Sequence, residues 1–387
     1  MKTRLLILIS ILLSCIFIML PTPAFADDPR AKPNNKIGIH ILFPSELEDA
    51  ARLINNNGGQ WGYVIIPIQS GDKDLKKWQD FMDGAKRLHV IPIIRLATEG
   101  DYFNTKVWRK PQDADIVDFA NFLNSLTWPT KNRYVVVYNE VNRSDEWGGL
   151  SDPAEYAQIL SYAVTVFKSK SVDFFIISSG MDNASITVPG TSFNQYDYFS
   201  LMQSAVPGIF NQIDGIASHS YPNPGFIQPV TRDGPHTVNS FKYEKRYIEG
   251  FSEKNLPVFI TETGWVKDRV PDATIGLYYR QAFESVWNDE SVVAVTPFIL
   301  TASGPFAPFS FTNPDGNKSE GYKAVFELPK IKGEPESGPV GQVLGDEIKP
   351  KANLPVIDFS KKKDSTRNSF SVPSSIRVIG KFLLNIE

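Results

Sequence analysis

Two glutamates, each placed just after an apolar stretch, are the residues whose positions point most directly to chemistry. Glu140 follows the apolar run of RYVVVYNEVN (133–142), and Glu262 follows that of LPVFITETGW (256–265). In a barrel of parallel strands the C-terminal strand ends open onto one face, where catalytic side chains gather. Two carboxyl groups that flank a sugar ring can break a glycosidic bond, because one protonates the leaving oxygen and the other attacks the sugar carbon or activates a water. The sequence therefore predicts such a site if the chain builds this barrel.

The arrangement of apolar runs predicts the barrel. The runs alternate with segments of helical character, and they are continuous rather than alternating, which is typical of parallel strands covered on both faces. They span residues 36–43, 61–68, 90–96, 133–138, 173–179, 213–218, 256–262 and 292–300. About eight strand–helix pairs in roughly 300 residues fit one (β/α)₈ TIM barrel. The alternative is an open doubly wound sheet, which usually has a glycine-rich turn after its first strand; this chain has Leu-Phe-Pro-Ser at 42–45.

Composition and missing motifs exclude several other classes. The 387-residue chain has a net charge of −3 and 42% apolar residues, so nothing in its charge favours nucleic acid. It has four histidines and a single cysteine, Cys15. The sequence therefore argues against a structural zinc site and against a disulfide framework. The glycine signature of a dinucleotide site and the Gly-x-Ser-x-Gly elbow of acyl transfer are both missing. We expect no cofactor and no metal, and a carbohydrate as the partner.

The two ends of the chain differ in composition from the middle. Lys2 and Arg4 precede an uncharged run over residues 5–20, and Ala-Phe-Ala at 24–26 matches a cleavage site. We therefore expect a signal peptide over 1–26, cleaved after Ala26, a linker over 27–35, and a secreted or cell-envelope protein without stable membrane insertion. The catalytic domain is expected over 36–329. Residues 330–387 begin with a Pro-, Gly- and Lys-rich linker and predict a poorly structured tail. The sequence does not indicate an oligomeric state.

The residues around both glutamates resemble those of clan A glycoside hydrolases, the (β/α)₈ retaining enzymes that include families 5 and 39. The resemblance rests on Asn139-Glu140 after the fourth strand and Glu262 after the seventh. It implies that Glu140 is the acid/base, that Glu262 is the nucleophile and that Asn139 bonds the 2-hydroxyl group of the sugar. The His-Ser-Tyr sequence at 219–221 resembles the His-x-Tyr of family 5, which implies that the Tyr221 hydroxyl group donates to Glu262.

Two positions depart from that pattern. The clan commonly has a tryptophan at the end of strand eight as a sugar platform, whereas this chain has Phe298, and the expected stacking residue is either Phe298 or one of Phe306 and Phe309. Family 5 places an arginine from strand two near the nucleophile; here the available arginine is Arg95, at the end of the third expected strand. These departures concern the family more than the clan.

Some residues have two readings that the sequence alone leaves open. Trp147 and Trp265 are candidates for stacking on pyranose rings, and each is equally suited to core packing. His219 either contacts the sugar or forms a hydrogen bond below the site. Asp145 and Glu146 are expected to be solvated loop acids. At the level of function, a carbohydrate-binding barrel without catalysis is the alternative, and an inverting hydrolase would place its carboxyl groups about 6.5–9.5 Å apart instead of about 5–5.5 Å.

Overall fold

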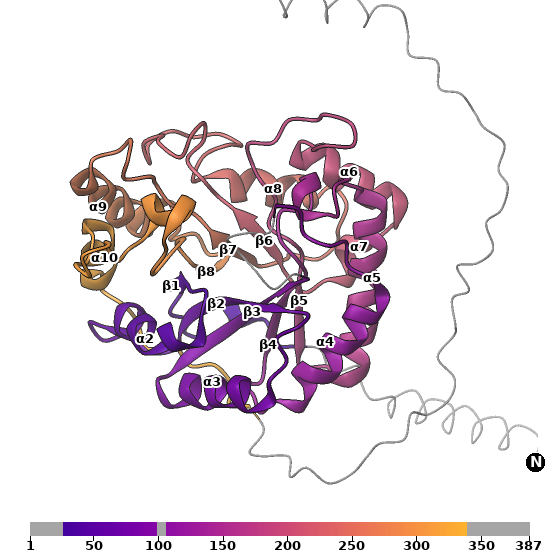
Figure 1. Ribbon diagram of the computed structural model, residues 1–387, viewed down its shortest axis with the longest axis horizontal. Coiled ribbons are helices and arrows are strands. Elements are labelled where there is room, and N and C mark those ends of the chain that lie inside the picture. Colours follow the sequence, from indigo (N-terminus) through magenta and orange to yellow (C-terminus); the bar gives the residue numbers. More distant parts are fainter. Residues whose placement is uncertain (1–25, 99–105, 339–387) are drawn as a thin grey trace, which may run out of the picture. The chain divides into compact units, whose positions relative to one another are not determined.

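The described part of the chain is a barrel of parallel strands surrounded by helices. The computed structural model describes residues 26–98 and 106–338, and within these ranges eight strands alternate with helices (Figure 1). The strands are β1 (Gly38–His40), β2 (Gly62–Gln69), β3 (Val90–Ala97), β4 (Arg133–Val136), β5 (Phe174–Ile177), β6 (Ile216–His219), β7 (Val258–Glu262) and β8 (Val292–Val295). Parallel pairing joins β1 to β5 in order, and likewise β6 to β8. Single parallel bridges, Ile37–Val295 and Ile177–Gly215, join the two sheets at both seams. The predicted (β/α)₈ barrel is confirmed.

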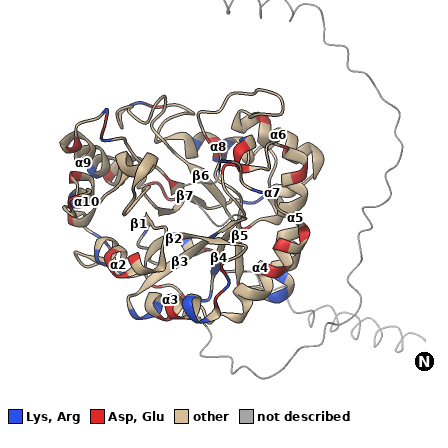
Figure 2. Ribbon diagram, viewed as in Figure 1, with Lys and Arg blue, Asp and Glu red and all other residues tan. Residues whose placement is uncertain are grey.

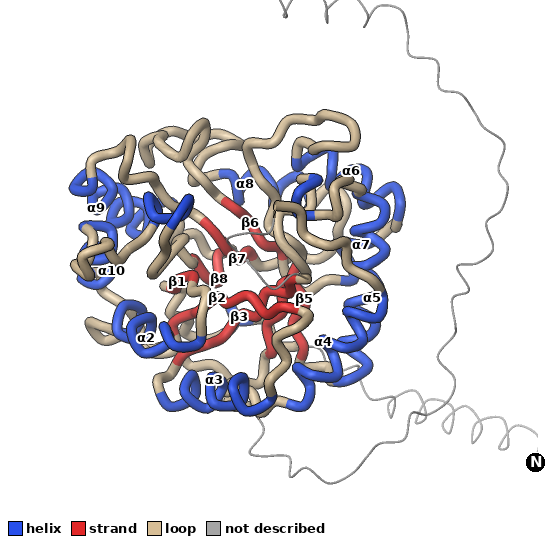
Figure 3. Tube along the Cα trace, viewed as in Figure 1, coloured by secondary structure: helices blue, strands red, loops and turns tan. Residues whose placement is uncertain are grey.

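The helices lie outside the strands, as the blue and red segments of Figure 3 show. They are α2 (Leu47–Asn55), α3 (Leu75–Arg87), α4 (Asp113–Ser125), α5 (Pro153–Lys170), α6 (Gln195–Ala205), α7 (Ile209–Gln212), α8 (Ser240–Ile248), α9 (Asp272–Gln281) and α10 (Glu320–Glu327). Local sequence fixes several starts: the Asp152 side chain accepts hydrogen bonds from the backbone N–H groups of Ala154 and Glu155, and Pro153 occupies the first helical position. Figure 2 shows acidic and basic residues interspersed on these outer helices.

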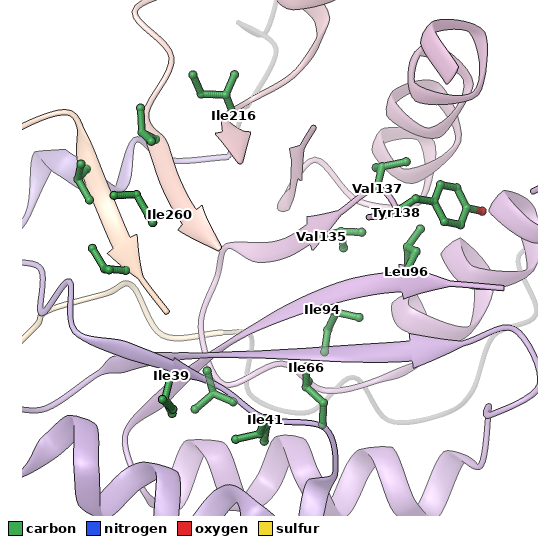
Figure 4. Close-up of a cluster of buried hydrophobic side chains, with 14 of the residues drawn as sticks. Ile39, Ile41, Ile66, Ile94, Leu96, Val135, Val137, Tyr138, Ile216 and Ile260 are labelled. Atoms are coloured by element: carbon green, nitrogen blue, oxygen red, sulfur yellow. The ribbon is translucent and has the colours of Figure 1, made fainter. Parts of the chain in front are cut away.

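Two apolar layers hold the barrel together. Between strands and helices, isoleucines from neighbouring strands pack together, for example Ile39, Ile66 and Ile94 (Figure 4). Each is fully buried, and such burial stabilises the fold by about 1.5–3 kcal/mol per side chain. Inside the barrel, a second cluster combines aliphatic and aromatic side chains, with Tyr134 packed against Phe259 at a ring separation of 5.5 Å. The chemically reactive side chains gather instead at the C-terminal end of the barrel.

The strand ends at that C-terminal face carry the polar residues. His40 ends β1, His219 ends β6 and Glu262 ends β7, while Arg95 lies two residues before the end of β3. All four side chains are buried. The fold therefore brings charged groups from distant parts of the sequence together at one end of an otherwise apolar barrel.

The opposite end of the barrel is covered by both flanks of the domain. The Asp27 backbone N–H donates to Asn132 Oδ1 at 3.0 Å, and Lys131 N–H donates to the carbonyl of Glu336 at 2.8 Å. The first nine residues of the expected tail, 330–338, thus contact the barrel through backbone hydrogen bonds. The expected signal peptide, apart from Ala26, and tail residues 339–387 lie outside the described residues. In the described ranges no helix is both long and apolar enough to cross a membrane.

Candidate active site

Glu262 is held by two fixed donors. It is the last residue of β7 and is 7% exposed. Arg95 Nη1 donates to its Oε1 at 3.0 Å, and the Tyr221 hydroxyl group donates to its Oε2 at 3.0 Å. Each carboxylate oxygen therefore has one hydrogen-bond donor, and one of the donors is a guanidinium, whose positive charge stabilises the carboxylate. The predicted contacts of Arg95 and Tyr221 with Glu262 are present.

Glu140 reaches the same face by an unusual backbone path. β4 ends at Val136, earlier than the sequence predicts, and the backbone turns at Tyr138 (φ 68°) and Glu140 (φ 35°). These left-handed conformations are uncommon for residues other than glycine, and they cluster at functional sites. The Glu140 N–H donates to the Gly180 carbonyl at 3.0 Å, which anchors the turn to the segment after β5. The turn places the Glu140 side chain over the barrel mouth.

The two carboxylates face each other across His219. His219 Nδ1 lies 2.9 Å from Glu140 Oε1 and 3.8 Å from Glu262 Oε2. This nitrogen and one oxygen of each carboxylate lie within 4.8 Å of one another. A distance of at most 4.8 Å between the closest oxygens is compatible with the roughly 5–5.5 Å of a double-displacement pair and lies below the roughly 6.5–9.5 Å of an inverting pair. Burial opposes the charged imidazolium, but Glu262 and Glu140 outweigh it, so the pKa of His219 is raised.

Asn139 lies between a cation and a third carboxyl group. Arg95 Nη1 also donates to Asn139 Oδ1, and Asn139 Nδ2 donates to Glu146 Oε1 at 3.2 Å. Burial and then the charge of Glu140 raise the pKa of Glu146 to about 8. The expectation that Glu146 is a solvated loop acid is therefore wrong, because the 3-10 turn η3 (Ser144–Glu146) brings it into the site.

These groups line a cavity of about 320 Å³ at the C-terminal end of the barrel. It is lined by Leu42, Arg95, Leu96, Ala97, Thr98, Lys106, Trp108, Pro111, Tyr138, Asn139, Glu140, Arg143, Asp145, Glu146, Asp182, Tyr221, Phe226, Glu262, Phe298, Phe306 and Phe309. One wall is aromatic: Phe298 packs against Phe306 and Phe309 at ring separations of 5.4 and 5.8 Å. Phe298 thus lies where the sequence expects a stacking residue.

The two tryptophans predicted as possible platforms lie elsewhere. Trp147 packs between Tyr138 and Tyr156 at 5.9 and 5.6 Å, and Trp265 packs against Tyr279 at 5.1 Å. Both are fully buried and neither lines the cavity, so the core-packing alternative applies to them. His219, at 1% exposed, also lies beneath the cavity rather than in its wall, which matches the second reading of that residue.

Sequence reasoning did not single out many residues of the cavity wall, among them Trp108, Arg143 and Asp182. Arg143 is the most consequential, because its Nη1 lies 3.0 Å from Glu140 Oε2. Its position three residues after Glu140 is the only signal that could have found it. Asp182 and Trp108 come from loops, where sequence spacing carries no information about contact.

Glu140, His219 and Glu262 are also the group of described residues whose geometry could hold a metal ion. The guanidinium groups of Arg95 and Arg143 each lie 3.0 Å from one of these carboxylates. A divalent cation would have to displace both positive charges. The donor set therefore fits a pair of reacting carboxylates better than a metal centre.

Comparisons with known proteins agree with this fold. No protein-family model and no curated protein sequence matches the chain. A family 39 glycoside hydrolase from Bacteroides cellulosilyticus WH2 is similar in structure, with a TM-score of 0.54 and 17% identity, covering 79% of this chain and 64% of that one. A GH128 (subgroup II) endo-beta-1,3-glucanase from Sorangium cellulosum has a TM-score of 0.51 and 14% identity, covering 76% of this chain and 98% of that one. The chain thus spans less than two thirds of the first protein and nearly all of the second. At these identities the likeness shows the fold alone, a (β/α)₈ barrel.

Proposed function

We propose that this protein is an exported retaining glycoside hydrolase that cleaves O-glycosidic bonds of an oligo- or polysaccharide by double displacement. Glu262 is the nucleophile and Glu140 is the acid/base. The observation that carries the proposal is the geometry of this pair: carboxylate oxygens within 4.8 Å of each other, on strand ends far apart in sequence, facing one cavity. A site that only binds sugar does not require two opposed carboxylates.

In the first step, Glu262 attacks the anomeric carbon and Glu140 gives its proton to the leaving oxygen. Arg95 and Tyr221 hold Glu262 in position before the attack, each with one hydrogen bond to its carboxylate. In the second step, Glu140 takes a proton from water, which attacks the glycosyl–enzyme bond and releases Glu262. Asn139, held between Arg95 and Glu146, is placed to bind a sugar hydroxyl group beside the reacting centre.

The structural likeness to an endo-beta-1,3-glucanase makes β-linked glucans the first substrates to test. A panel of aryl β-glycosides and soluble glycans is incubated with the purified protein, and ¹H NMR follows the anomeric configuration of the first product formed. We expect the product to keep the configuration of the substrate. Initial inversion would exclude double displacement, and no hydrolysis by any member would exclude the activity over that panel.

A carbohydrate-binding barrel without catalysis is the second candidate. It is favoured by one observation, the phenylalanine at a position where clan A enzymes commonly have a tryptophan platform. Calorimetry with oligosaccharides beside a reducing-sugar assay separates the two functions, because binding without release of reducing ends supports only the second.

We also propose that the protein is exported after cleavage behind Ala26. The support is the sequence pattern of residues 1–26. Intact-mass measurement of the protein recovered from the medium or envelope of an expressing bacterium tests this, and we expect an N-terminus at Asp27. A mass that retains residues 1–26 would contradict it.

A further inference from the structure

Arg143 binds three carboxyl groups of the cavity rim. It is anchored to Asp145 by two contacts, Nη2 to Oδ2 at 2.6 Å and Nε to Oδ1 at 3.1 Å. Its remaining nitrogen, Nη1, donates to Glu140 Oε2 at 3.0 Å and lies 3.9 Å from Asp182 Oδ2. The side chain is 37% exposed. One end of the guanidinium is therefore fixed, and the other lies between two carboxylates.

This contact conflicts with the role of an acid. A general acid must carry a proton when the leaving oxygen departs. A guanidinium 3.0 Å from Glu140 Oε2 occupies the place where that proton is needed and favours the charged carboxylate. Before Glu140 can donate, Arg143 must withdraw from it.

The other groups around Glu140 do not supply this control. His219 from β6 lies 2.9 Å from the opposite oxygen, Oε1. Glu262 from β7, Glu146 from η3 and Asp182 from the segment after β5 are acids, and wherever one of them is ionised its charge disfavours a negative charge on Glu140.

Two further groups of the site are already engaged. Arg95 from β3 and Tyr221 after β6 donate to Glu262, each at 3.0 Å. Arg143 donates to Glu140 at 3.0 Å, so its displacement would change the protonation of Glu140 while leaving the donors of the nucleophile undisturbed.

We propose that Arg143 is a positioning residue that gates the proton of Glu140: it pairs with Glu140 in the empty site and, still held by Asp145, moves from Glu140 to Asp182 when a leaving group fills that side of the cavity. This rests on the proposed function. With Arg143 displaced, Glu140 binds a solvent proton and gives it to the leaving oxygen as the C–O bond breaks; it regains a proton from the water that attacks the glycosyl–enzyme bond, and Arg143 stays charged throughout. No reactant other than substrate and water takes part.

The surroundings of Asp182 support this movement. Burial and the charge of Glu140 raise the pKa of Asp182, so an approaching guanidinium would be a favourable partner for its carboxylate. The two loops that carry Arg143 and Asp182 are also joined, since Ser144 N–H donates to the Thr191 carbonyl at 2.7 Å. The guanidinium therefore needs only a short shift along one connected rim.

The test is the pH profile of Arg143→Gln, with Arg143→Lys as the conservative variant. All proteins carry Glu146→Gln, because Glu146, with its pKa of about 8, would titrate in the same range. In Arg143→Gln we expect the alkaline limb of kcat/KM on a phenyl glycoside, which needs acid assistance, to move up by roughly one pH unit. Arg143→Lys should move it less. A 2,4-dinitrophenyl glycoside, whose departure needs no acid, should show no such movement.

A matched control is Arg280→Gln, which breaks an ion pair with Glu327 at 2.9 Å away from the cavity and should leave the profile unchanged. Identical limbs in the Arg143→Gln and parent proteins would overturn the proposal, as would equal shifts with both leaving groups.

A second measurement needs no turnover. In protein labelled with ¹³C at the glutamate carboxyl carbons, Glu140→Gln identifies the Glu140 signal. We expect its titration midpoint to rise in Arg143→Gln, and an unmoved midpoint would refute the gate even if the protein cleaved no glycoside. An inactive protein would contradict the proposed function, whereas an active protein with unmoved limbs would contradict only the role of Arg143.

Discussion

The two opposed carboxylates differ in what holds them. Glu262 has two fixed hydrogen-bond donors, the guanidinium of Arg95 and the phenol of Tyr221, and both side chains are buried. Glu140 has a titratable imidazole and a guanidinium whose side chain is 37% exposed. A nucleophile must stay ionised and aimed, while an acid/base must exchange a proton twice in each cycle. The surroundings of each carboxylate therefore match the role proposed for it.

The walls of the cavity follow the same division. Near Glu262 lies the aromatic group that contains Phe298 and Tyr221, and near Glu140 lie the charged residues Arg143, Asp145 and Asp182. An apolar wall excludes water and strengthens electrostatic contacts beside it. Charged side chains in the other wall can exchange protons with water and change their ion-pair partners. One cavity thus combines a static half with an adjustable half.

The largest expected effect comes from removing the static carboxylate. Glu262→Gln keeps the size of the side chain but cannot form the glycosyl–enzyme bond, so we expect kcat to fall on the order of 10⁴-fold or more. Initial rates on an activated aryl glycoside measure the loss. Sodium azide should not restore turnover with retention.

Glu140→Ala is the matched comparison on the adjustable side. In this variant we expect kcat to fall by about 10²–10⁴-fold on substrates that need an acid and much less on a dinitrophenyl glycoside. Azide should restore part of the rate by forming a glycosyl azide, because azide attacks without a general base. Rescue of Glu262→Gln instead of Glu140→Ala would reverse the two assignments.

The next effect concerns the pH dependence of stability, and it comes from another buried carboxyl group. Glu244 of α8 is 2% exposed, and burial raises its pKa from 4.5 to about 7. The folded protein therefore holds this proton where the unfolded chain has lost it, so the free energy of unfolding falls as pH rises from about 4.5 to 7, by on the order of 3 kcal/mol. That is about 100-fold in the unfolding constant.

Glu244→Gln should flatten this dependence, because the amide does not ionise. Denaturant unfolding at a series of pH values from 4.5 to 8 measures it, with Glu284→Gln on the exposed surface as the control. A slope as steep in Glu244→Gln as in the parent would show that the loss of stability has another origin.

A smaller effect on kcat measures how much the Tyr221 hydrogen bond contributes to holding Glu262. Tyr221→Phe removes the hydrogen bond to Oε2 but keeps the ring packing against Phe226 at 5.0 Å. A hydrogen bond to a charged group contributes about 1.5–3 kcal/mol, so we expect kcat to fall about 10- to 100-fold with little change in KM. Tyr63→Phe, which removes a bond to Asn34 at the far end of the barrel, is the control. A rise in KM alone would make Tyr221 a binding residue.

The same division marks what the sequence could predict. Continuous apolar runs predicted the eight described strands, because both faces of each strand are buried, and the strand ends located Glu140 and Glu262. Arg95 and Phe298 also lie in the cavity where strand counting placed them. Arg95 and Glu262 belong to strands, whose geometry follows from local sequence, while Glu140 and Phe298 lie a few residues beyond the ends of β4 and β8.

The residues that sequence reasoning did not place in the site lie on the charged side of the cavity, near Glu140. Arg143, Glu146 and Asp182 lie on segments after β4 and β5, where position depends on turns such as the left-handed residues Tyr138 and Glu140. Trp147 illustrates the same limit: its sequence suits a sugar platform or a core, and only the packing beneath Tyr138 decides between them.

The smallest effect concerns the aromatic wall itself. Phe298 lines the cavity but is 7% exposed, so only part of its ring is available to a sugar. Because stacking contributes about 0.5–1.5 kcal/mol, Phe298→Leu should raise KM roughly 2- to 10-fold and leave kcat nearly unchanged. Phe298→Trp should lower KM, since it restores the broader ring that resembling enzymes have there. Phe283→Leu, equally buried against Trp287 at 4.9 Å outside the cavity, controls for loss of packing. If Phe298→Leu lowered kcat instead, the aromatic wall would act on the reacting centre, and the division between a static binding half and an adjustable proton-handling half would have to be redrawn.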